Sequence, residues 1–93
     1  MDFDSAARCI HELRCNGTRA AGAAHELECE VDSSRVFSTD IKRTLEALIN
    51  SLFPKFGIID AAVLDEIENI LLQYDDFVRS YMARRLQNAP LNQ

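Results

Sequence analysis

Cysteine and histidine residues gather in the first third of the chain, where their chemistry could hold a metal ion. Cys9, His11, Cys15, His25 and Cys29 provide five soft or borderline ligands. Zinc takes such ligands four at a time in tetrahedral geometry, and a His and a Cys four residues apart on a helix present two of them together. The predicted metal set is Cys9, Cys15, His25 and Cys29, which would make the protein a small zinc-binding module.

The spacing of this set, C-x5-C-x9-H-x3-C, resembles that of the CHHC zinc fingers of RNA-associated proteins. Cys15 stands where that family has a histidine as its second ligand. The resemblance covers this stretch of the chain alone. It implies a zinc ion held by the four side chains of the predicted metal set.

A second interpretation of the same residues is structural. If two antiparallel helices carry the repeated His-Glu-x-x-Cys strings, the two His/Cys pairs lie about 10 Å apart along the helix axis, because each residue rises 1.5 Å. Four ligands from the two strings then cannot meet on one ion. The three cysteines would be small buried hydrophobes and the histidines surface residues. We favour this interpretation and keep zinc as the alternative.

Catalysis by these residues would need partners that the sequence does not supply. A zincin-type site requires two histidines and a third ligand, and a Cys–His nucleophile requires an orienting group and an oxyanion site. The zincin set cannot be assembled from this sequence. Cys9–His11 and Cys29–His25 are available as Cys–His pairs, but each would still need the orienting group and the oxyanion site. We therefore predict no catalytic residue and expect that the protein is not an enzyme.

Composition and charge indicate which partners and which cellular compartment to expect. The formal net charge is −5, which opposes general binding to nucleic acid or to anionic membranes. No apolar run approaches the roughly 20 residues of a membrane span. The acidic start, Met1–Asp4, lacks the features of a signal peptide, and the chain has 3 cysteines, an odd count that suits a reducing compartment. We expect an intracellular protein, cytoplasmic or nuclear.

The strongest pattern lies in residues 60–87, where apolar side chains recur every three or four positions behind a good N-cap, Asp60. This pattern predicts one long amphipathic helix. A second apolar row, at Val63, Ile70 and Phe77, makes the stripe wider than the seam of a two-stranded coiled coil. The helix should therefore touch more than one neighbour. We expect these residues in the core or an interface: Leu64, Ile67, Ile70, Leu71, Tyr74, Phe77, Val78 and Tyr81.

The helix that precedes it should begin at a cap formed by Ser38 or Thr39 and stop at Pro54. The short connection that follows predicts that residues 38–88 form an antiparallel helical hairpin. Before this hairpin we expect a linker at 32–37, and after it a disordered tail at 89–93.

The first 31 residues are more ambiguous. A short helix is predicted over 4–15, and a second helix from a cap at Thr18, because alanine-rich segments favour helix. The unbroken polar–apolar alternation of 25–31 is also typical of a half-buried strand. The predicted fold is a single all-α domain, a small helical bundle, with an α+β fold as the alternative.

An apolar stripe wider than the chain can cover is typically buried by self-association or by a partner's helix. The sequence therefore favours a non-catalytic protein–protein interaction module, an assembly or adaptor subunit without a cofactor. Its expected partner is a second copy of itself, as a homodimer, or a helical protein. A further hypothesis, an acidic inhibitor or decoy that occupies a basic site, rests on net charge alone.

Overall fold

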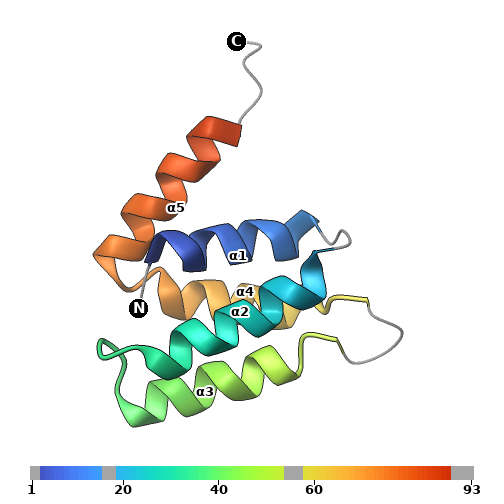
Figure 1. Cartoon of the computed structure of the whole chain (residues 1–93), viewed down its shortest axis with the longest axis vertical. Helices are drawn as coiled ribbons and strands as arrows, with labels where there is room; N and C mark the ends of the chain where they lie inside the picture. Colours follow the sequence, from blue (N-terminus) through green and yellow to red (C-terminus); the bar gives the residue numbers. More distant parts are fainter. Residues whose placement is uncertain (1–2, 16–18, 54–57, 89–93) are drawn as a thin grey trace.

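The regular structure of the chain is helical (Figure 1). The computed structural model describes residues 3–15, 19–53 and 58–88. Within these ranges it has no strand, so the all-α prediction is confirmed and the alternative strand at 25–31 is wrong. The predicted cap at Thr18, the connection at 54–57 and the predicted tail at 89–93 fall outside the described residues. The helices are α1 (Phe3–Cys15), α2 (Ala20–Ser33), α3 (Thr39–Asn50), α4 (Ala61–Leu71) and α5 (Asp75–Asn88).

Two helices begin at the caps that the sequence predicts. The Ser38 hydroxyl accepts a hydrogen bond from the Ile41 backbone N–H, 3.3 Å away, at the start of α3. The Asp60 carboxylate accepts from the backbone N–H groups of Ala62 and Val63, at 3.0 and 3.4 Å, at the start of α4. Each cap satisfies N–H groups that would otherwise lack a partner in the first turn.

The segment 25–31 lies in α2 because its apolar residues continue a helical face. Ala20, Ala23, Ala24, Leu27 and Val31 are all buried, at the three- and four-residue spacing of one side of a helix. The polar residues between them take the other side. A short polar–apolar alternation is thus compatible with the two-residue period of a strand and with the 3.6-residue period of a helix. The alanines that precede it favour the helix.

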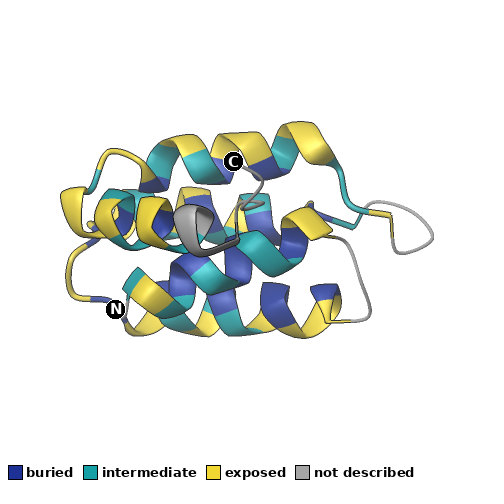
Figure 2. Cartoon of the chain, turned by 90° about the horizontal axis from the view of Figure 1, so that it is seen from above, coloured by how far each residue is buried: buried dark blue, intermediate teal, exposed yellow. Residues whose placement is uncertain are grey.

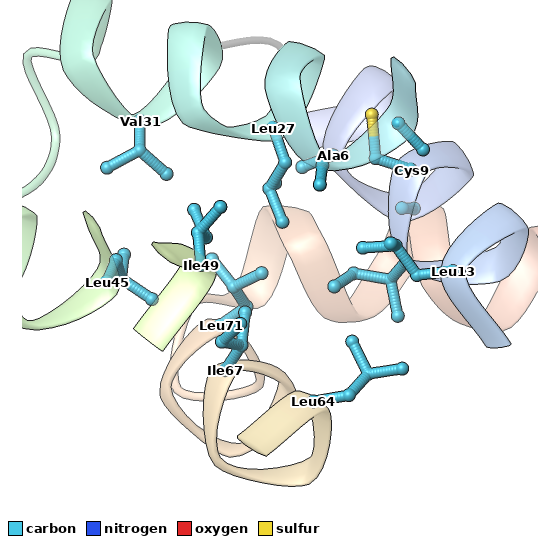
Figure 3. Packing of buried hydrophobic residues seen from close by; sticks show 14 of the residues in the cluster. Ala6, Cys9, Leu13, Leu27, Val31, Leu45, Ile49, Leu64, Ile67 and Leu71 are labelled. Atoms are coloured by element: carbon cyan, nitrogen blue, oxygen red, sulfur yellow. The ribbon is translucent and has the colours of Figure 1, made fainter. Parts of the chain in front are cut away.

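The first four helices surround a common core, since α1 packs against α2, α2 against α3, α3 against α4, and α4 against α1. Their buried residues face inward and their exposed residues face outward (Figure 2). Side chains from all four meet in the middle, among them Leu13 of α1, Leu27 of α2, Ile49 of α3 and Ile67 of α4 (Figure 3). The fifth helix packs mainly on α1 and leaves the other four at a steep angle (Figure 1).

The single helix predicted over residues 60–87 is wrong, because the chain turns between α4 and α5. The backbone N–H groups of Gln73 and Tyr74 donate to the carbonyls three residues earlier, at 3.2 and 3.0 Å, which closes α4 in a tight turn. The Val78 N–H then donates to the Tyr74 carbonyl at 3.0 Å and opens α5. The turn redirects the last helix from α4 onto α1.

Candidate functional site

The residues predicted for the core or an interface lie mostly in the core of the chain itself. Leu64, Ile67 and Leu71 of α4 and Phe77 and Tyr81 of α5 are buried. The other three, Ile70, Tyr74 and Val78, are partly buried. The turn between the two helices makes this possible, because it gives α4 and α5 different neighbours. Most of the predicted stripe is therefore covered without a partner.

Three aromatic rings hold that turn in place. The Tyr74 ring lies 4.9 Å from the ring of Phe37 and 6.1 Å from the ring of Phe3, measured between centroids. Phe3 and Phe37 are themselves 6.3 Å apart, edge to face. These separations fall in the range of favourable aromatic pairs. The cluster joins the start of α1, the connection between α2 and α3, and the turn before α5.

Helix α5 is anchored on α1 by one side. Phe77 is 0% exposed, and its ring stacks on that of Tyr81 with centroids 5.3 Å apart. At the same interface, Arg84 of α5 and Asp4 of α1 form an ion pair of 3.5 Å. The apolar contacts supply most of the stabilisation, since an exposed ion pair contributes little.

A neighbouring side of α5 is open. Val78 is half-buried and Met82 is 50% exposed, and both line a shallow hollow together with Asp75, Arg79 and Ala83. Sequence reasoning missed Met82, although its position four residues after Val78 places both on one helix face. The hollow offers apolar contact area bordered by one acidic and one basic side chain.

A charged cleft lies between α1, α4 and α5, lined by His11, Arg14, Glu68, Tyr81 and Arg84. Arg14 donates hydrogen bonds to Glu68 and, at 2.6 Å, to Asp65. Burial acts to lower the pKa of Arg14, but the hydrogen bonds to Glu68 and Asp65 outweigh it and raise that pKa above its ordinary value. These surface ion pairs link α1 to α4.

Cys9 lies in the core and is 0% exposed. Burial, reinforced by the negative charge of Glu26, raises the pKa of the Cys9 thiol to about 12. The thiolate is the form that binds metals and acts as a nucleophile. At neutral pH this residue is therefore a small apolar core side chain, as the structural interpretation of the cysteines predicts for it.

The other two cysteines are exposed, so the expectation that all three are buried is wrong for Cys15 and Cys29. The Cys15 sulfur lies 3.8 Å from Nε2 of His11, and the Cys29 sulfur lies 3.7 Å from Nε2 of His25. Each contact joins residues four apart on one helix, which face the same side.

The two His/Cys pairs face different parts of the molecule. His11 lines the cleft formed by α1, α4 and α5, whereas His25 lines a hollow between α2 and α3 beside Ile49 and Phe53. The structure thus does not bring the predicted metal set together. Among the described residues, no three Cys, His, Asp or Glu side chains gather closely enough to hold a metal ion.

None of the five helices that the structure describes combines the length and the apolar character required to cross a bilayer. The chain matches no protein-family model, and no curated protein or solved structure is significantly similar to it.

Proposed function

We propose that this chain is a non-catalytic protein–protein interaction module, an assembly or adaptor subunit that docks through the open face of α5. We define this face by Val78 and Met82 and by the polar residues that border them. Its partner is a second copy of the chain, or a helix of another protein.

The observation that carries the proposal is the half-covered state of α5. One side of this helix is packed on α1, while Met82 on a neighbouring side is 50% exposed. Large apolar side chains placed side by side on an exposed helix are typical of a surface that packs on another helix. Met is well suited to this role because its flexible thioether adapts to different partner shapes.

The face is narrower than the sequence pattern predicts. Leu71, Phe77 and Tyr81 are buried inside the chain, so they add nothing to a docking surface in this conformation. A small apolar area with a polar border is typical of a reversible association. We therefore expect a dimer that forms at micromolar concentration and dissociates on dilution.

Sedimentation velocity over a range of micromolar concentrations tests the proposal. The native chain should sediment as a concentration-dependent dimer, and Met82→Asp should shift it to monomer, because a charge at the centre of an apolar contact is costly to bury. Helical circular dichroism of the variant should stay unchanged, since the side chain is exposed in the single chain.

Ala47→Asp provides the matched control. Ala47 is exposed on α3, away from α5, and the substitution adds the same charge. This variant should dimerise like the native chain. A native chain that stays monomeric throughout the concentration range would contradict the homodimer, and an equal effect of both substitutions would show that net charge, not the α5 face, controls association.

A further inference from the structure

The His25/Cys29 pair on α2 has the geometry of one half of a tetrahedral zinc site. In such a site, Zn–S of about 2.3 Å and Zn–N of about 2.0–2.1 Å at the tetrahedral angle place the two ligand atoms about 3.6 Å apart. The Cys29 sulfur and the His25 Nε2 are 3.7 Å apart. The separation of the two atoms is therefore the one that a single bridging zinc ion requires.

The pair is also accessible to a second molecule. His25 and Cys29 are both exposed, and so are Ala21 and Gly22 one turn earlier on the same helix. A Cβ atom built on Gly22 would meet no atom of the described residues within 4 Å. This part of α2 is thus open and lined by small side chains, which allows another helix to approach closely.

Electrostatics favours this pair over the equivalent pair on α1. Helix α2 contains no Lys or Arg. Glu26 pairs with Arg8 of α1, and three further acidic residues of α2 add negative charge that favours a cation: Glu28, Glu30 and Asp32. The His11/Cys15 pair instead lies beside the cleft, whose lining includes two guanidinium groups, of Arg14 and Arg84, and one carboxylate, of Glu68. Cationic neighbours oppose the binding of a divalent cation.

We propose that the His25/Cys29 pair binds zinc together with the same pair of a second copy of this chain. The two pairs complete a Cys2His2 set around a two-fold axis, a ligand set that structural zinc sites use. Each Cys29 thiol releases its proton to solvent on binding, each His25 imidazole binds through Nε2 in its neutral form, and no electron is transferred. The resulting centre carries no net charge.

The acidity of α2 makes this contact depend on the metal. Without zinc, the carboxylates of two facing α2 helices repel each other. With zinc, the bonds to both pairs outweigh that repulsion. Removal of the ion should therefore separate the copies again.

This zinc-dependent contact does not depend on the open face of α5, and the test distinguishes the zinc-dependent dimer from the dimer proposed to form through α5. The chain carrying Met82→Asp is freed of metal with a chelator and titrated with zinc sulfate, and native mass spectrometry measures chain number and bound zinc together. The measured mass should change from that of one chain to that of two chains with one zinc ion bound. Excess chelator should restore the mass of the monomer. The native chain should bind zinc with the same stoichiometry.

Cys29→Ala and His25→Ala should each abolish the zinc-dependent doubling of mass, while the matched variant Cys15→Ala retains it. All three residues lie on helix surfaces, so circular dichroism should show unchanged helicity. Zinc bound at one ion per single chain, no zinc bound at all, or loss of the effect in Cys15→Ala would each overturn the proposal.

Discussion

Replacing Phe77 by alanine should weaken the folded chain more than any change on the exposed side of α5. The Phe77 ring is fully buried and stacks on Tyr81 where α5 meets α1. Truncating a buried phenylalanine to alanine costs about 3–5 kcal/mol, because apolar contacts are lost and a cavity remains. A chain of this size unfolds with a free energy of roughly 5–14 kcal/mol. The substitution should therefore remove a fifth of the stability at the least.

Urea unfolding followed by circular dichroism measures this effect, with Val78→Ala as the matched control. Val78 is the next residue of α5 but only half-buried, so its truncation should cost below about 1.5 kcal/mol. If α5 separates locally before the rest unfolds, the transition of the Phe77→Ala chain should also broaden. Equal midpoints for the two variants would refute the assignment of Phe77 as the anchor of α5.

Three further changes test other parts of the structure. Burial raises the pKa of the Cys9 thiol to about 12 from the ordinary 9.0, so the unfolded chain releases the thiol proton at a lower pH than the folded chain. The contribution of the buried thiol to the free energy of unfolding is therefore complete below about pH 9 and is lost as the pH rises toward 12. Urea unfolding at alkaline pH should show a weaker pH dependence for Cys9→Ala than for the native chain. Gly22→Ala should raise the free energy of unfolding by about 0.5–1 kcal/mol, because the position is helical and the added methyl group would meet no atom of the described residues. A lower free energy of unfolding would contradict this. Asp60→Ala should lower the free energy of unfolding by about 1 kcal/mol through loss of the α4 cap, whereas Asp60→Asn should keep most of that stability because Asn also caps helices. Equal losses in the two variants would show that the charge of Asp60, and not its capping hydrogen bonds, stabilises α4.

The parts of the fold that depend on local rules could be predicted from the sequence. The caps at Ser38 and Asp60 fix two helix starts through hydrogen bonds within one turn, and such short-range bonds need no knowledge of the tertiary structure. The buried face of α4 likewise follows from residue spacing, since Leu64, Ile67 and Leu71 repeat at the helical period.

The turn between α4 and α5 could not be predicted from hydrophobic spacing. The three- and four-residue alternation continues from Leu71 to Tyr74 and Val78 without a proline or glycine to mark an end. What stabilises the turn is the contact of Tyr74 with aromatic rings from distant parts of the chain. One local signal was present: Asp75 and Asp76 occupy the first turn of α5, where the helix dipole favours negative charge.

The candidate metal site shows a different limit. Ligand types and their spacing indicate which residues are able to bind zinc, but not which side of the bundle each one faces. Cys9 lies in the core. His11 lines the cleft between α1, α4 and α5, whereas His25 lines the hollow between α2 and α3. Only the pairs spaced four residues apart on one helix could be expected to meet, since they depend on helix geometry alone.

The central position of α1 has a consequence for synthesis of the chain. Helix α1 precedes the other four described helices in the chain, yet its neighbours include α4 and α5, which come last among the five. On the ribosome, α1 can pair with α2 early, while the side that α5 covers stays open to water until the final described helix emerges. The core that these helices share is therefore complete only after α5 has emerged, and until then the apolar side of α1 that α5 covers is exposed to aggregation.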